Sequence, residues 1–229
     1  MQHKIKLIEC PRDAMQGWPH FISTQKKIEY INALLKVGFD TIDFGSFVSP
    51  KAIPQMADTA DVLRGLQIEN GKSKLLAIIA NQRGAEDAVV FDEITYLGFP
   101  FSVSETFQMR NTNSTIAQSL GRVEEIQNLC IKNKKELVVY MSMGFGNPNG
   151  DVYSEEIVFD WVNKLVDMDI SIISLADTVG LATKEQVYDI TKYLVDSLPD
   201  TEIGVHLHST PTNWKEKVDA ALQVGCLRF

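Results

Sequence analysis

The sequence has little cysteine, and its three cysteines fit neither a disulfide framework nor a zinc site. Cys10, Cys130 and Cys226 lie far apart, and their number is odd. Disulfide-stabilised secreted domains carry an even number of cysteines, and structural zinc sites pair cysteines about two to four residues apart. We therefore expect reduced thiols and a cytoplasmic location.

Long apolar runs, an N-terminal leader and basic clusters are also absent from the sequence. No stretch approaches the roughly 20 apolar residues of a membrane helix, and no charged and then apolar leader opens the chain. The net charge of −8 argues against a nucleic-acid partner. We expect neither a membrane nor a nucleic acid as partner. An anionic substrate would need local positive charge from an arginine, a lysine or a metal ion.

The chain does contain a regular alternation of apolar runs and segments with helical spacing. The strand-like runs are Ile5–Cys10, Thr41–Phe47, Lys74–Ala80, Glu93–Gly98, Leu137–Met143, Ser171–Ala176 and Glu202–His208. The helix-like segments are Thr24–Val37, Pro54–Leu66, Gly84–Val90, Thr115–Asn133, Ser154–Met168, Thr183–Leu198 and Thr212–Val224. Helix N-caps are predicted at Thr24, Ser154 and Thr183, and C-terminal caps at Gly38 and Gly225.

Buried strands that alternate with helices predict a parallel α/β fold. We predict a TIM (β/α)₈ barrel, a single catalytic domain over residues 1–229, incomplete at its C-terminus. Its eighth strand only begins at Cys226–Phe229, and the elements after it are missing. A barrel short of one strand exposes edges, which predicts aggregation or a homodimer. An open doubly wound sheet is the alternative, although no G-x-G-x-x-G motif follows any strand.

Polar side chains gather where the predicted strands end. The carboxyl ends of the strands carry the active site of a TIM barrel, so these side chains are candidate site residues. They are Arg12 and Asp13 after the first strand, Asp43 and Ser46 in the second, Asn81 after the third, Ser104 after the fourth, Asp177 and Thr178 at the sixth, and His206 and His208 at the seventh.

The most specific signal is Val205-His206-Leu207-His208-Ser209. Residues i and i+2 of a strand point to the same face, so both imidazoles would meet at one place. Together with Asp13 they form a two-histidine, one-carboxylate set suited to Mg²⁺, Mn²⁺ or Fe²⁺, or to Zn²⁺ with a water. Arg12 beside such a metal could stabilise an enolate oxygen. The pattern indicates metal-assisted carbonyl chemistry.

Structural roles compete with these functional ones. Arg12 and Asp13 could pair with each other, and Asp43 could be a buried polar residue that bonds neighbouring strands. Asp177 could cap the turn before Gly180. We expect Asp58 to face solvent on a helix. Cys226 is expected in the core rather than as a nucleophile, and Cys10 likewise.

Four motifs resemble those of the 3-hydroxy-3-methylglutaryl-CoA lyases, metal-dependent TIM barrels. They are P-R-D-A-M-Q at residues 11–16, S-F-V-S-P-K with the following P-Q-M-x-D at 46–58, I-S-L-A-D-T-V-G at 173–180, and V-H-L-H at 205–208. The resemblance runs through the whole chain in unbroken order. The S-F-V-S-P-K segment separates the lyases from the related acyl-CoA condensing enzymes.

The resemblance implies cleavage of 3-hydroxy-3-methylglutaryl-CoA, an acyl-CoA substrate, to acetyl-CoA and acetoacetate. By position, Asp13, His206 and His208 would bind Mg²⁺ or Mn²⁺, and Arg12 would stabilise the thioester enolate. Asp43, Asp177 and His206 would take catalytic roles, with His206 as a proton carrier. The residues expected to bind substrate are Arg12, Gln16, Ser46, Ser104 and Thr178.

The sequence departs from the family pattern at several positions. Asp43 replaces a glutamate, Ala14 replaces a glycine, and G-F-G-N-P-N-G at residues 144–150 stands where many lyases have a cysteine-containing segment. A glycine-rich loop with the family's catalytic cysteine would lie after Phe229, so the 229-residue chain is expected to be inactive or nearly so. The alternatives are an acyl-CoA condensing enzyme or aldolase that uses a 2-oxo acid, and an inactive barrel fragment.

Overall fold

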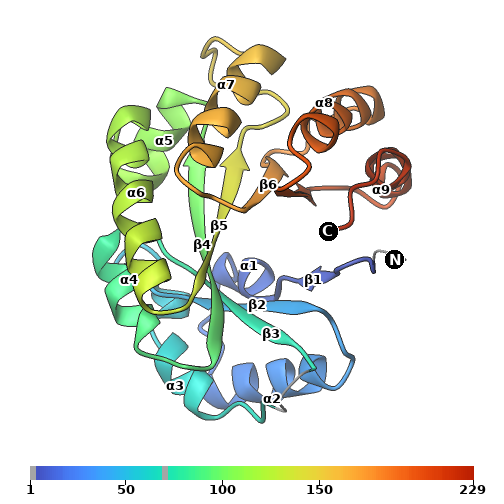
Figure 1. Cartoon of the computed structure of the whole chain (residues 1–229). Helices are drawn as coiled ribbons and strands as arrows, with labels where there is room; N and C mark the ends of the chain where they lie inside the picture. The colour runs from blue at the N-terminus through green and yellow to red at the C-terminus, as the bar shows by residue number, and fades with distance from the viewer. Residues whose placement is uncertain (1–3, 69–71) are drawn as a thin grey trace. The chain divides into compact units, whose positions relative to one another are not determined.

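The computed structural model describes residues 4–68 and 72–229, and the chain divides into two compact units. The N-terminal unit comprises Lys6–Gly98 and Asn128–Glu136. The C-terminal unit comprises Phe99–Gln127 and Leu137–Phe229, with residues 4–5. Strand β4 (Ile94–Ser102) and helix α6 (Ile116–Lys132) each contribute residues to both units (Figure 1).

In the N-terminal unit, helices connect parallel strands. Its elements are β1 (Ile8–Glu9), α1 (Pro11–Gln16), α2 (Thr24–Leu35), β2 (Thr41–Ser46), the 3₁₀ helix η1 (Pro54–Met56), α3 (Thr59–Arg64), β3 (Lys74–Ile78) and α4 (Gln82–Val89). Each strand pairs in parallel with the next, from β1 to the first part of β4. Every residue of β2 is buried, as expected for a central strand with both faces covered.

The C-terminal unit repeats the same arrangement. It holds α5 (Glu105–Thr112), β5 (Glu136–Ser142), α7 (Glu155–Val166), β6 (Ile172–Asp177), α8 (Lys184–Ser197), β7 (Glu202–Leu207) and α9 (Trp214–Gln223). Strands β5, β6 and β7 pair in parallel. Helix α8 buries Val187, Ile190, Thr191 and Leu194, the spacing of one helical face.

The order of the strands decides between the two predicted folds. Across the sheet they run β1-β2-β3-β4-β5-β6-β7, the same order as along the chain. A doubly wound sheet has a point at which the strand order reverses. Sequential parallel strands are the barrel pattern, so the doubly wound alternative is wrong and the α/β prediction is confirmed.

After α9 the chain returns to the edge of β7 without forming a full strand. A single parallel bridge joins Gly204 to Arg228, and the Val205 amide donates to the Arg228 carbonyl over 3.0 Å. A Cβ atom at Gly204 would lie 3.0 Å from the Arg228 side chain. The expected beginning of an eighth strand is therefore present, and the strand itself is absent.

Several element boundaries differ from the predictions. Helices α1 and α5 were not predicted, β4 runs on to Ser102, and the predicted helix over Pro54–Leu66 is broken between η1 and α3. In a continuous helix the Gln55 carbonyl would accept from the amide of residue 59. Here it accepts from the ammonium of Lys27 instead, and the helix restarts after Asp58.

The predicted caps are mostly confirmed. Ser154 and Thr183 accept from the amides of Ile157 and Gln186, and Gly38 and Gly225 have φ of 89° and 84°. The prediction for Thr24 is wrong, because Ser23 occupies the N-cap position and the Thr24 hydroxyl donates to Asp58. Ala14 lies inside α1 and is not among the residues with positive φ, so the loss of a glycine there needs no strained backbone.

A buried lysine holds the loop between α4 and β4. The Lys135 ammonium donates to the carbonyls of Phe91, Asp92 and Ile94 over 2.8, 3.3 and 2.7 Å. Burial lowers the pKa of Lys135. This loop lies at the amino-terminal end of β4.

No helix in the described part of the chain is long and apolar enough to cross a membrane.

Candidate active site

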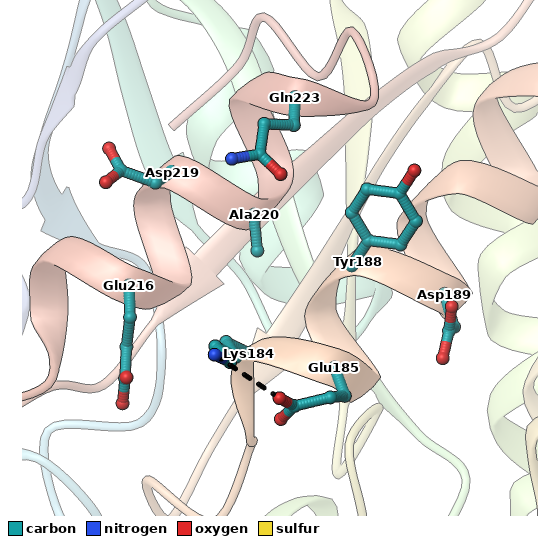
Figure 2. Close-up of a pocket in the computed structure, with 8 residues that line it drawn as sticks. All are labelled: Lys184, Glu185, Tyr188, Asp189, Glu216, Asp219, Ala220 and Gln223. Atoms are coloured by element: carbon teal, nitrogen blue, oxygen red, sulfur yellow. Dashed lines mark ion pairs between the residues drawn. The ribbon is translucent and has the colours of Figure 1, made fainter.

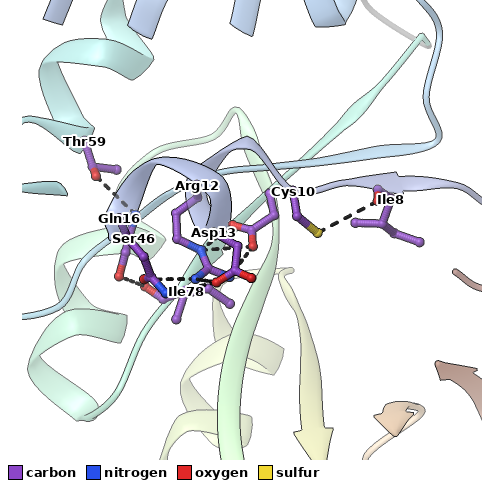
Figure 3. A network of polar contacts seen from close by, with 9 residues as sticks. Ile8, Cys10, Arg12, Asp13, Gln16, Ser46, Thr59 and Ile78 are labelled. Carbon is purple, nitrogen blue, oxygen red and sulfur yellow. Dashed lines mark hydrogen bonds and ion pairs between the residues drawn. The ribbon is translucent and has the colours of Figure 1, made fainter. Parts of the chain in front are cut away.

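In the N-terminal unit four of the predicted site residues, Arg12, Asp13, Gln16 and Asp43, form one hydrogen-bonded network at the carboxyl end of β1 (Figure 3). Arg12, on α1, points to Asp43 of β2. Its Nε lies 3.0 Å from Asp43 Oδ2, and its Nη2 lies 2.5 Å from the same oxygen. Arg12 is 9% exposed and Asp43 1%. The pair is therefore a buried ion pair in which two nitrogens of Arg12 donate to one carboxylate, and such charge-assisted hydrogen bonds are stronger than neutral ones.

The remaining nitrogen of the guanidinium contacts two further predicted residues. Arg12 Nη1 donates to Asp13 Oδ1 over 2.9 Å and to Gln16 Oε1 over 3.1 Å, and Gln16 Nε2 donates to Asp13 over 2.9 Å. Helix α1 makes this possible, because residues three and four apart share a face. The expected pairing of Arg12 with Asp13 is therefore present, and the pairing of Arg12 with Asp43, which was not predicted, is added to it.

The electrostatics of this network keep Arg12 charged. Burial opposes a charge on Arg12, but the charge and hydrogen bonds of Asp43 outweigh it and raise the pKa of the guanidinium. Burial raises the pKa of the neighbouring Cys10 thiol, and Asp43 adds to that rise. Cys10 is thus a protonated thiol at neutral pH rather than a nucleophile.

Ser46 and the P-Q-M-x-D segment serve the local fold of this unit. The buried Ser46 hydroxyl donates to the Ile78 carbonyl over 3.1 Å. Asp58 was expected to face solvent, which is wrong: its carboxylate lies 2.6 Å from the ammonium of buried Lys27. Gln55 accepts from the Ile22 amide and donates to the His20 carbonyl, so it fixes the segment that follows α1.

In the C-terminal unit, His206 and His208 lie together as the strand pattern predicts. Their ring centroids are 5.2 Å apart at an interplanar angle of 62°. His206 is the last but one residue of β7, at its carboxyl end, and His208 follows just past the strand. Tyr140 of β5 also contacts His206, edge to face, at 5.8 Å. Tyr140 was not among the predicted site residues, because a tyrosine in an apolar strand carries no distinctive sequence signal.

Strand register separates Asp177 from this pair of imidazoles. Ala176 of β6 lies opposite His206, and Asp177 lies opposite Leu207. Because successive strand residues alternate between faces, Asp177 and His206 belong to opposite faces of the sheet. Asp177 forms a buried ion pair with Lys217 of α9, 2.7 Å from Oδ2 to Nζ, and accepts from the Ala182 amide over 3.1 Å. The bond from the Ala182 amide holds the turn that contains Gly180, which is the capping role expected for Asp177.

Lys217 is a functional candidate that the sequence reasoning missed. It is 1% exposed and lies on the apolar stripe of α9 with Ala220 and Ala221. A lysine at such a position needs a buried partner, because an unpaired charge inside a protein is costly. The signal in the sequence was a charged residue that shares a helix face with two small apolar residues three and four positions later.

Ser104 and Thr178 are both engaged in hydrogen bonds within the C-terminal unit. Ser104 is the N-cap of α5 and also donates to Asp151, which accepts from the Thr106 amide over 2.9 Å. The Thr178 hydroxyl accepts from the Met143 amide over 2.8 Å. These bonds hold the loops after β4, β5 and β6. Substrate contacts by Ser104 and Thr178 stay predictions.

A separate groove lies between α8 and α9 (Figure 2). None of the residues that line it is a predicted site residue. Four acidic residues line it, Glu185, Asp189, Glu216 and Asp219, and Lys184 pairs with Glu185 at 3.6 Å. Its negative charge does not suit an anionic acyl-CoA.

Comparison with known proteins bears on the family and the fold. The HMGL-like family model matches residues 4–226. The hydroxymethylglutaryl-CoA lyase of Bacillus subtilis is 33% identical over 222 residues, which cover 96% of this chain and 73% of that protein. The mitochondrial hydroxymethylglutaryl-CoA lyase of mouse is 32% identical, over 97% of this chain and 68% of that protein.

Solved structures agree. A crystal structure of the Bacillus subtilis HMG-CoA lyase superposes with a TM-score of 0.92 at 33% identity, covering 99% of this chain and 76% of that one. An Acinetobacter baumannii HMG-CoA lyase in complex with coenzyme A and 3-methylmalate gives 0.91 at 34% identity, covering 99% and 73%. The match confirms the predicted TIM-barrel class, with the eighth strand absent from this chain. The chain belongs to the HMGL-like family, the family of the hydroxymethylglutaryl-CoA lyases.

Proposed function

We propose that this protein cleaves 3-hydroxy-3-methylglutaryl-CoA to acetyl-CoA and acetoacetate. Its relatives carry the name of that reaction, and one was solved with coenzyme A. The observation that carries the proposal is the Arg12 network. A buried guanidinium, kept charged by Asp43, stands at the carboxyl end of a barrel strand, where an enolate oxygen would need it.

The reaction is further proposed to need Mg²⁺ or Mn²⁺, held by Asp13, His206 and His208. Two imidazole nitrogens and a carboxylate oxygen form a donor set that fits these ions and leaves positions open for substrate. The close contact between the two imidazoles supports a shared role. Such an ion, when bound, lowers the pKa of a hydroxyl that it contacts, here the tertiary hydroxyl of the substrate.

The chain's own residues would then act in sequence. A base removes the proton of the tertiary hydroxyl, and we assign the transfer of this proton to His206. The bond between C2 and C3 breaks, and its electron pair passes to the thioester, which becomes the enolate of acetyl-CoA. The oxygen that lost its proton becomes the ketone of acetoacetate. The enolate carbon takes up a proton to give acetyl-CoA.

Arg12 would stabilise the enolate oxygen, and Asp43 would orient Arg12. The Asp43 carboxylate occupies Nε and one hydrogen of Nη2, and Asp13 and Gln16 occupy Nη1. We assign the second Nη2 hydrogen to the enolate. Because Asp43 reaches Arg12 at hydrogen-bond distance, the shorter side chain still gives a two-point ion pair. We give Asp43 and Asp177 positioning roles in this mechanism.

Four side chains complete the proposed substrate site: Gln16, Ser46, Ser104 and Thr178. Gln16 is half-buried and its amide already faces the charged network, so it is the one best suited to direct substrate contact.

A cytoplasmic location is part of the proposal, supported by three free cysteines and by a cytoplasmic lyase of rat that is 31% identical. A homodimer stays a prediction.

Acetoacetate release from 3-hydroxy-3-methylglutaryl-CoA in the presence of Mn²⁺ tests the proposal. Arg12→Gln should lower kcat about 10²–10³-fold, the cost of losing one oxyanion donor. Arg64→Gln is the matched control, since Arg64 is an exposed arginine of the same unit, paired with Asp61. Retention of activity within threefold in Arg12→Gln would refute the role of Arg12. Release of free coenzyme A from acetyl-CoA and 2-oxo acids, without acetoacetate release, would favour a condensing enzyme, as Asp43 in place of glutamate allows.

A further inference from the structure

The structure assigns to Lys217 the role of a positioning residue for the histidine pair. This inference rests on the proposed metal site, and it concerns how the C-terminal unit holds that site in shape. Lys217 reaches His208 through the backbone carbonyl of that residue.

The Lys217 ammonium joins three segments of the chain. Its Nζ lies 2.7 Å from Asp177 Oδ2, 3.1 Å from the His208 carbonyl and 3.4 Å from the Gly180 carbonyl. Asp177 ends β6, Gly180 closes the turn that follows it, and His208 follows β7. One buried cation therefore ties the ends of two adjacent strands to α9.

At the His208 carbonyl, such a contact restrains an otherwise exposed segment. Residues 208–212 are exposed, and hydrogen bonds such as Thr210 N to Asn213 Oδ1, 2.7 Å, join members of the same short segment. The peptide that follows His208 is fixed to buried structure by Lys217. Because the backbone torsions of His208 direct its imidazole, an anchored carbonyl limits where the ring can point.

Asp177 explains why Lys217 can remain buried. An isolated ammonium in the protein interior is costly, and pairing together with hydrogen bonding offsets that cost. The Asp177 carboxylate supplies the opposite charge on the face of the sheet away from His206, and its other oxygen accepts from the Ala182 amide. The ion pair thus supports the strand ends from the opposite face of the sheet and leaves open the face that carries the histidines.

Hydrogen–deuterium exchange and Mn²⁺ titration of the Lys217→Met variant test this role. In the metal-free protein, residues 206–213 should exchange faster than in the unaltered chain. Mn²⁺ affinity, read from the electron paramagnetic resonance of the free ion, should fall at least tenfold, the scale on which supporting residues act on metal sites. Lys135→Met is the matched control, because Lys135 is also buried and bonds backbone carbonyls, at the amino-terminal end of β4. It should change neither reading.

Lys217→Met leaves Asp177 buried without its partner, so the double variant Lys217→Met, Asp177→Asn accompanies it. The double variant removes both charges and should fold more readily, while exchange at residues 206–213 stays fast and Mn²⁺ binding stays weak. Unchanged exchange there in either folded variant would overturn the inference. The exchange reading needs neither metal nor substrate, so it decides the role of Lys217 whether or not the unaltered protein releases acetoacetate.

Discussion

Replacing Asp43 by asparagine should destabilise the protein by about 3 kcal/mol, because it leaves a buried cation without its main partner. Asp43 is 1% exposed and accepts from two nitrogens of Arg12 at 2.5 to 3.2 Å. Removing one member of such a pair costs roughly 3–5 kcal/mol. The lower figure applies because Arg12 keeps its contacts with Asp13 and Gln16. A loss of this size is a large part of the 5–15 kcal/mol that typically stabilises a folded protein.

Urea unfolding followed by tryptophan fluorescence would measure this change, with Asp61→Asn as the control. Asp61 also pairs with an arginine of the same unit, at 2.6 Å, but both side chains are more than 60% exposed. Such surface pairs contribute about 0.5 kcal/mol or less. A double-mutant cycle with Arg12→Met isolates the pair, since removing both charges should cost less than the sum of the single changes. A loss below about 1 kcal/mol in Asp43→Asn, equal to that of Asp61→Asn, would refute the reasoning.

Two further predictions concern titratable groups. Hydrogen bonds from Ser104 and Thr106 lower the pKa of Asp151 in the folded protein below its ordinary 3.8. The stability that Asp151 provides is therefore present above pH 3.8 and is lost as the pH falls through the lower, folded value. The urea midpoints of the unaltered protein and of Asp151→Asn should differ at pH 5 and converge as the pH falls below 3.8; a constant difference would contradict this. Burial raises the pKa of Cys226 to about 11, so its thiol should react with a disulfide reagent at pH 8 only on unfolding. Fast reaction of Cys226 in the folded protein, resolved by peptide mapping, would show that the thiol is accessible.

Strands and histidines could be predicted because their signals are local. Seven apolar runs between capped helical segments place the strands to within a few residues, and the i, i+2 rule places both imidazoles together. Helix α1 was missed because its residues carry the site chemistry instead of an apolar stripe. The break at residues 57–58 was missed because it depends on Lys27, some 30 residues earlier in the chain.

The partners of the buried charges could not be predicted for a related reason. Asp43 and Arg12 were both named as site residues, but their pairing with each other was not predicted. Asp177 and Lys217 are 40 residues apart, and only the register of β6 against β7 decides which face Asp177 occupies. Sequence periodicity identifies a residue as buried, but the identity of its partner requires the packed structure.

Lys135 makes its loop sensitive to chemical modification. An ammonium has three N–H donors, and here three carbonyls accept from it. Acetylation would leave a single N–H on that nitrogen and add bulk where the side chain is 9% exposed. An acetylated Lys135 could form only in a molecule whose α4–β4 loop had opened. The extent of Lys135 acetylation therefore measures how often this loop opens in the native protein.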